Sequence, residues 1–135
     1  MKKRIVALLL VAALIAALTG CSRYSTHYNA VAFVHSNDAH NAYMSYFKFE
    51  GTMVFQLKGE KNAPVALRYS GATETGTAAV YYDYNGTKTE LFTLGAGESA
   101  ASTSETFTPN GTIYVIVETS EPCENGRFDF EIMTK

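Results

Sequence analysis

Two stretches near the C-terminus alternate between apolar and polar residues, and this alternation limits the possible folds more than any other feature of the chain. The first covers residues 112–118 and the second residues 127–132. The apolar members are Ile113, Val115 and Val117, then Phe128, Phe130 and Ile132. A strand with one apolar face and one polar face must bury the apolar face against another layer. The two stretches therefore predict a β-sandwich or a β-barrel.

The preceding residues follow the same pattern of short runs separated by Gly, Asn and Pro, which is typical of an all-β domain. Asn85-Gly86 is the strongest turn signal, because both positions of such a turn need positive φ. We expect a loop over 95–104, with a short edge strand near Phe107. Further strands are predicted at 30–35, 44–50, 52–58 and 65–70, with a hairpin over 81–91. The expected fold is a single antiparallel β-sandwich of about eight strands, with jelly-roll or Greek-key-like topology.

The N-terminus has the organisation of a secretory signal. A positive patch, Lys2 to Arg4, precedes 14 apolar residues, Ile5 to Leu18. A membrane-spanning helix needs about 20 apolar residues, whereas runs of about 10 to 14 are typical of signal-peptide cores or buried helices. A buried helix is disfavoured because no polar face interrupts the run. The small residues that follow complete the pattern of a cleaved signal.

Leu18-Thr19-Gly20-Cys21 resembles the lipobox of bacterial lipoproteins. The resemblance implies that the Cys21 thiol takes a diacylglyceryl group and that a peptidase cuts just before it. The alternative is an ordinary signal peptide that is followed by Cys21 by chance. Two or more acyl chains would make a stable anchor, because each buried methylene contributes about 0.8 kcal/mol.

The lipobox divides the chain into a signal peptide (1–20), a lipidated tether (21–29) and a β-sandwich domain (30–135). The expected location is the extracytoplasmic face of a bacterial cell membrane. Ser22 favours the outer membrane, by resemblance to lipoprotein sorting, if the host has two membranes.

Without the signal peptide the chain keeps 8 Lys and Arg against 13 Asp and Glu, a net charge of −5. Nucleic-acid binding usually needs a basic face, so we expect no nucleic-acid partner.

The mature chain as a whole resembles small lipoproteins of gut-type bacteria. The motifs that carry the resemblance are "YFKFEGT", "VALRYSG", a Tyr-rich hairpin, "GTIYVIVE" and "GRFDFEI". More distantly, the chain is similar to the β-sandwich domains appended to secreted peptidases. These motifs consist of strand and turn residues. The resemblance therefore implies a fold and carries no active site across.

One polar cluster has residue types that bind transition metals. His35, Asp38 and His40 place two imidazoles and a carboxylate within six residues. Such groups can hold zinc, although a structural site needs a fourth ligand. The alternative is an Asx-type turn at Asn37 and Asp38, with the histidines beside it.

Tyrosine is abundant, with nine residues and no Trp in the chain. Tyr81, Tyr82 and Tyr84 cover both faces of the predicted hairpin, so at least one ring should point outward. Exposed rings can stack on sugars or anchor a protein partner. The alternative is a cross-strand Tyr ladder that stabilises the hairpin.

We expect no enzymatic activity and no cofactor. The sequence contains no Gly-x-Ser-x-Gly elbow, phosphate loop or His-Glu-x-x-His motif. If Cys21 is lipidated, Cys123 has no partner for a disulfide and is expected to be a small, partly buried apolar residue.

Taken together, these features predict a lipid-anchored binding protein that presents a surface to an envelope protein or a glycan. The alternatives are a metal-binding lipoprotein and a passive structural protein of the envelope.

Overall fold

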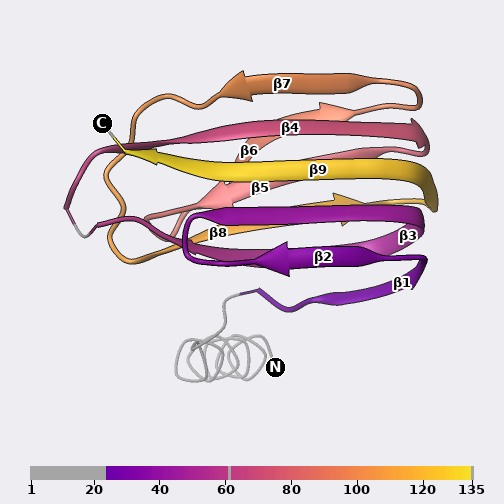
Figure 1. The fold of residues 1–135 in the computed structure, drawn as a ribbon, viewed down its shortest axis with the longest axis horizontal. Helices are drawn as coiled ribbons and strands as arrows, with labels where there is room; N and C mark the ends of the chain where they lie inside the picture. The colour runs from indigo at the N-terminus through magenta and orange to yellow at the C-terminus, as the bar shows by residue number, and fades with distance from the viewer. Residues whose placement is uncertain (1–23, 61, 135) are drawn as a thin grey trace, which may run out of the picture.

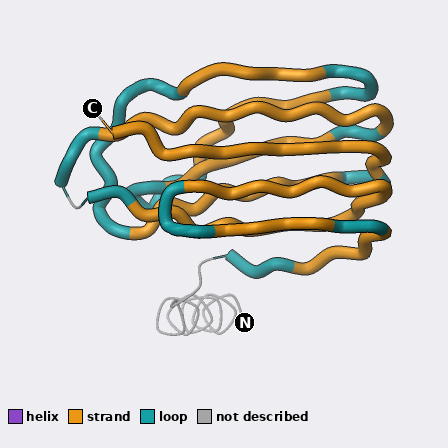
Figure 2. The backbone as a smooth tube through the Cα atoms, in the orientation of Figure 1, coloured by secondary structure: helices purple, strands orange, loops and turns teal. Residues whose placement is uncertain are grey.

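The computed structural model describes residues 24–60 and 62–134, and these residues form nine antiparallel strands. The predicted signal peptide and Cys21 lie outside the described residues. Figures 1 and 2 show strands joined by turns and loops, without a helix in the described part of the chain. The described residues accordingly include no helix that could span a membrane. The strands are β1 (His27–Val31), β2 (Val34–Asn37), β3 (Asn41–Lys58), β4 (Val65–Thr75), β5 (Ala78–Asp83), β6 (Thr89–Leu94), β7 (Ser99–Thr103), β8 (Thr112–Thr119) and β9 (Cys123–Thr134).

The strands form a jelly-roll-like sandwich of two layers, and β3 belongs to both. Residues 41–49 of β3 pair with β9, whereas residues 52–58 pair with β8. We call β2, residues 41–49 of β3, β9, β4 and β7 the front layer. We call residues 52–58 of β3, β8, β5 and β6 the back layer. Figure 1 shows β5, β6 and β8 lying behind the front layer. The predicted all-β sandwich is thus confirmed.

The core lies between the layers and uses the inward members of the alternating strands. Phe130 of the front layer packs against Phe55 of the back layer, with ring centroids 6.0 Å apart. Phe128 likewise meets Phe92 at 6.2 Å. The apolar residues of the two C-terminal stretches are all buried, as the alternation predicts. Burial of apolar surface contributes roughly 25 cal/mol per Å², so this two-sided core is the main source of stability.

The phase of the alternation changes inside β3. Tyr46 and Phe49 are both buried, while the two residues between them are exposed. The facing strand has a matching irregularity at Asn125, whose φ is 50°. An irregularity of this kind bends a strand and increases its twist. The bend directs the second half of β3 into the back layer.

Gly51 lies at the bend of β3, with φ of 131°. A Cβ atom there would lie 2.4 Å from the His27 carbonyl oxygen of β1. The sequence predicted two strands, 44–50 and 52–58, on either side of this glycine. The structure joins the two runs into one strand that continues through Gly51.

We expect Gly51→Ala to destabilise the domain by about 1 to 2 kcal/mol more than Gly111→Ala does. Gly111 is the matched control, because its φ of 147° is similar while nothing lies within 4 Å of a Cβ there. The difference between the variants therefore reports the contact with β1 and not the backbone conformation. Urea denaturation of both variants would measure it. Equal losses would show that β1 moves aside without cost.

Three predictions, two of strands and one of a loop, are corrected by the structure. The predicted strand over 30–35 is two strands, because Ala32 has φ of 51° and breaks the run, and β1 begins at His27. The predicted loop over 95–104 contains β7, which pairs with β4. Phe107 forms a single bridge to Val65 and no strand. Ser99–Thr103 consists of small residues, so it lacks the apolar alternation that reveals a strand.

Candidate functional site

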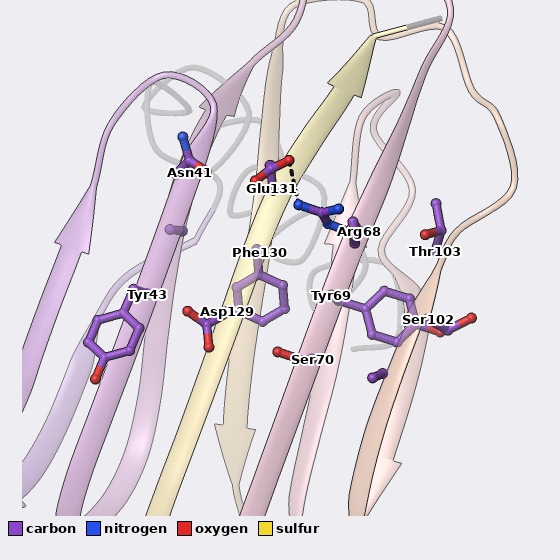
Figure 3. Close-up of a pocket in the computed structure, with 12 residues that line it drawn as sticks. Asn41, Tyr43, Arg68, Tyr69, Ser70, Ser102, Thr103, Asp129, Phe130 and Glu131 are labelled. Carbon is purple, nitrogen blue, oxygen red and sulfur yellow. Dashed lines mark hydrogen bonds and ion pairs between the residues drawn. The ribbon is translucent and has the colours of Figure 1, made fainter.

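A groove of about 480 Å³ runs across the outer face of the front layer. Its outward side chains form two cross-strand rows that follow the register of β3, β9, β4 and β7. The first row is Asn41, Glu131, Arg68 and Thr103, and the second is Tyr43, Asp129, Ser70 and Ala101. Figure 3 shows the labelled side chains of both rows on four neighbouring strands that line the groove. Four separate segments of the sequence therefore build the groove.

The hollow exists because the sizes of the side chains in the rows are unequal. Ser70 and Ala101 are small and lie next to each other on β4 and β7. Tyr43 and Arg68 are long and stand on the same face. Directly opposite side chains on neighbouring strands lie about 5 Å apart, so a small pair leaves space that nothing else fills. The small pair forms the floor of the groove, and the long side chains form its walls.

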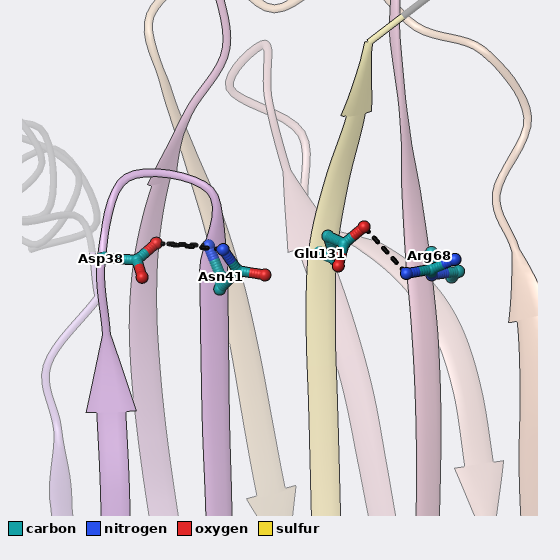
Figure 4. Close-up of polar contacts among 4 residues, drawn as sticks. All are labelled: Asp38, Asn41, Arg68 and Glu131. Carbon is teal, nitrogen blue, oxygen red and sulfur yellow. Dashed lines mark hydrogen bonds and ion pairs between the residues drawn. The ribbon is translucent and has the colours of Figure 1, made fainter.

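One ion pair lines the groove, and a second borders it through Asp129. Arg68 Nη2 donates to Glu131 Oε1 at 2.8 Å, and Arg127 Nε donates to Asp129 Oδ2 at 3.0 Å. Figures 3 and 4 show the Arg68–Glu131 pair bridging β4 and β9. The Arg68 and Glu131 side chains are 56% and 39% exposed. Exposed pairs contribute about 0 to 1 kcal/mol to stability. Both pairs therefore add little to folding and remain accessible to a ligand.

Tyr43 is the outward-pointing aromatic side chain of the groove, whereas Tyr69 and Phe130, which also line it, pack inward on Phe92 and Phe55. Its half-buried ring lies under the Arg127 guanidinium, whose carbon is 5.2 Å from the ring centroid. Arg127 is also bound to Asp129, which raises the pKa of its guanidinium further. A cation over one ring face holds the ring in place and is worth about 0.5 to 1 kcal/mol at an exposed site. Tyr43 is thus a fixed aromatic surface at one end of the groove.

The predicted tyrosines of the hairpin do not lie in this groove. Tyr82 and Tyr84 point inward, where both rings pack against Phe107. Burial raises the pKa of Tyr82. Tyr81 points outward from the back layer, and the Lys88 ammonium lies 4.4 Å from its ring centroid. The hairpin therefore places its rings on opposite faces, and Tyr81 alone of the three is on an outer face.

The candidate metal ligands are separated by their local contacts. Asp38 Oδ1 accepts hydrogen bonds from the backbone N–H groups of His40 and Asn41, at 2.9 and 2.8 Å. These two bonds hold the pKa of Asp38 below its ordinary value. Figure 4 shows the contact between Asp38 and Asn41 in the β2–β3 turn. The His35 ring stacks on Phe33 instead, at 4.9 Å. Within the described ranges, no group of three or more His, Cys, Asp or Glu side chains could hold a metal ion.

Cys123 begins β9 and is fully buried, whereas the sequence predicted partial burial. Burial raises the pKa of its thiol, and the charge of Glu121 adds to this effect. Its neighbours include Tyr46, whose hydroxyl lies 3.0 Å from Thr73 Oγ1. The thiolate is the reactive form of cysteine, so a raised pKa makes this thiol inert.

No protein-family model matches the chain, and no curated protein matches it. Among solved structures, the chain resembles three carbohydrate-binding modules (CBMs). The C-terminal CBM6 of LamC from Zobellia galactanivorans is 11% identical, with a TM-score of 0.39, and the match covers 84% of this chain and 95% of that one. TmCBM61, solved with beta-1,4-galactotriose, is 12% identical, with a TM-score of 0.42 and coverage of 76% and 70%. A CBM4 structure is 11% identical, with a TM-score of 0.40 and coverage of 79% and 81%. This resemblance is too distant to assign a ligand.

Proposed function

We propose that the chain is a lipid-anchored, non-enzymatic binding protein that holds a glycan in the front-layer groove. The observation that carries the proposal is the groove itself, with its fixed aromatic ring and its mixed donors and acceptors. Binding sites are typically concave and contain a few polar groups that orient the ligand. The groove combines these features on one rigid sheet face, where strand register and not a loop positions the side chains.

The charge of the groove favours a neutral, hydroxyl-rich ligand. Two guanidinium groups balance two carboxylates, because Arg68 pairs with Glu131 and Arg127 with Asp129. Guanidinium groups only donate hydrogen bonds and ionised carboxylates only accept them. A sugar hydroxyl does both, so it can bind to either group of a pair without adding charge. An anionic or cationic ligand would instead lie close to a group of its own charge in each pair.

The ion pairs also support a binding role. Asp129 and Glu131 are each bound to an arginine in the groove. Each pair holds its carboxylate on a guanidinium, where it serves as a hydrogen-bond acceptor. Both carboxylates are partly exposed, so a ligand hydroxyl can donate to them. The proposed location, at the extracytoplasmic face of a membrane through lipid on Cys21, follows from the lipobox.

We expect Tyr43→Ala to weaken glycan binding by up to about tenfold. A ring contact of this kind is worth about 0.5 to 1.5 kcal/mol, and 1.4 kcal/mol is tenfold in Kd. A screen of neutral polysaccharides by affinity electrophoresis would find the ligand, and calorimetry would then measure Kd. Tyr81→Ala is the matched control, because Tyr81 also lies under a cation but on the back layer. Loss of binding in Tyr81→Ala with none in Tyr43→Ala would contradict the proposed site.

A further inference from the structure

The segment before β1 is attached to the outer face of the back layer. The Tyr24 hydroxyl donates to Asp83 Oδ2 at 2.6 Å, and the Tyr24 ring meets Tyr114 edge-on at 5.3 Å. Asp83 and Tyr114 are cross-strand partners on β5 and β8. Two residues later, Thr26 Oγ1 accepts from the backbone N–H of Val54 at 3.0 Å. The chain therefore enters the domain along a path that is fixed at three strands of the back layer.

These contacts lie on the side of the sandwich opposite to the groove. Ile113 and Val115 point into the core, so Tyr114 between them points outward from the back layer. Asp83 follows the inward Tyr82 and also points outward. Asp83 is nonetheless buried. Its other carboxylate oxygen, Oδ1, accepts hydrogen bonds from the backbone N–H groups of Asn85 and Gly86. The groove residues point outward from the front layer.

The length of chain before Tyr24 limits how the domain can sit on a membrane. Only Ser22 and Arg23 lie between Cys21 and Tyr24, and the three steps from Cys21 to Tyr24 span at most about 11 Å when fully extended. The two layers of a sandwich are themselves about 10 Å apart, and outward side chains add to the thickness on both faces. A lipid on Cys21 therefore cannot extend past the outer face of the front layer while Tyr24 stays on the back layer.

We propose that the outer face of the back layer lies toward the membrane and that the groove faces away from it. This inference rests on the proposed lipid anchor. It goes beyond the proposed function because it states where the bound glycan comes from. A groove that faces away binds a glycan from the surrounding envelope or medium. It does not bind a glycolipid headgroup of the membrane that carries the anchor.

Labels on the two outer faces test this orientation. Gln56→Cys places a thiol beside Tyr114 on the back layer, and Ala101→Cys places one on the floor of the groove. Both positions are exposed, whereas Cys123 is buried. The full chain with each substitution is expressed in a bacterium that processes lipoproteins. It is then labelled with a fluorophore and reconstituted in phosphatidylcholine vesicles that contain a headgroup-quencher lipid.

We expect the label at position 56 to be quenched several-fold more strongly than the label at position 101. In detergent without quencher lipid, the two labels should have equal lifetimes, which controls for local quenching. A bulky polyethylene-glycol maleimide should modify unlabelled Ala101→Cys at the same rate on vesicles and in detergent, but should modify Gln56→Cys more slowly on vesicles.

Each contrary result has its own meaning. Equal quenching at both positions, or stronger quenching at position 101, would overturn the orientation while the anchor stands. Failure of the processed protein to float with vesicles would overturn both the anchor and the orientation. Binding of the Tyr43-dependent glycan is measured separately in solution. If no such binding is detected, the proposed ligand is overturned and the orientation result still stands.

Discussion

Phe128→Ala is expected to lower the free energy of unfolding by about 3 to 5 kcal/mol. The ring is fully buried between the layers, where it contacts Tyr46 and Phe92 at centroid distances of 6.5 and 6.2 Å. Gly71 lies against it so closely that a Cβ at Gly71 would be 2.6 Å from Phe128 Cδ1. The strands around the ring are joined by hydrogen bonds and cannot close over the cavity. Urea denaturation followed by circular dichroism would measure the loss.

Phe47→Ala is the matched control for this substitution. Phe47 is 52% exposed and lies on β3 next to the buried Tyr46. Its removal should change stability by no more than about 0.5 kcal/mol. Domains of this size are stable by about 5 to 15 kcal/mol, so Phe128→Ala should remove a large part of the total. A loss below about 1 kcal/mol in Phe128→Ala would contradict the two-layer core.

The domain should lose about 2 to 3 kcal/mol of stability between pH 10 and pH 12 through Tyr46 alone. Burial raises the pKa of Tyr46 to about 12, and its hydroxyl is paired with Thr73. The unfolded chain has the ordinary tyrosine pKa of about 10, so it loses this proton first as the pH rises. The stabilisation is complete below pH 10 and is lost as the pH rises toward 12. Urea denaturation at several pH values would give the curve.

Tyr46→Phe provides the comparison. The variant keeps the ring and removes the ionisable hydroxyl, so its stability should fall less steeply above pH 10. Thr73 Oγ1 still donates to the Thr75 carbonyl at 3.0 Å, so no buried hydroxyl loses its last partner. At neutral pH the loss should be about 0.5 to 1.5 kcal/mol. A constant difference between the two proteins from pH 8 to pH 12 would contradict the assignment.

The sequence predicted those strands that alternate between apolar and polar residues over a few consecutive positions. Phe128–Ile132 alternates strictly and Ile113–Val117 alternates except at Ile116, and both lie in strands whose alternating apolar residues are in the core. β7 was missed because Ser and Ala carry no periodic signal, and its pairing with β4 depends on contacts far away in the sequence. The division of 30–35 into two strands depends on one residue, Ala32, in a conformation that alanine rarely adopts.

The groove could not be predicted from the sequence, since its parts meet only through strand register. Tyr43 and Asp129 are neighbours because β3 pairs with β9, and Ser70 joins them because β9 pairs with β4. In the sequence each is an ordinary outward residue of a strand. The Tyr-rich hairpin drew attention because its residues are adjacent in the chain, and two of its rings point into the core.

The position of β3 at the junction of both layers has a consequence for the order in which the domain folds. Residue 41 pairs with residue 131, and residue 58 pairs with residue 112, so this early strand obtains its neighbours from the last part of the chain. Contacts over such separations form slowly, because the loop between them must first close. If the chain is exported N-terminus first, as the lipobox predicts, the back layer cannot be completed until β8 has emerged and the front layer cannot be completed until β9 has emerged. The late arrival of these partners would then keep the polypeptide unfolded during transport and delay the formation of the sandwich until its end.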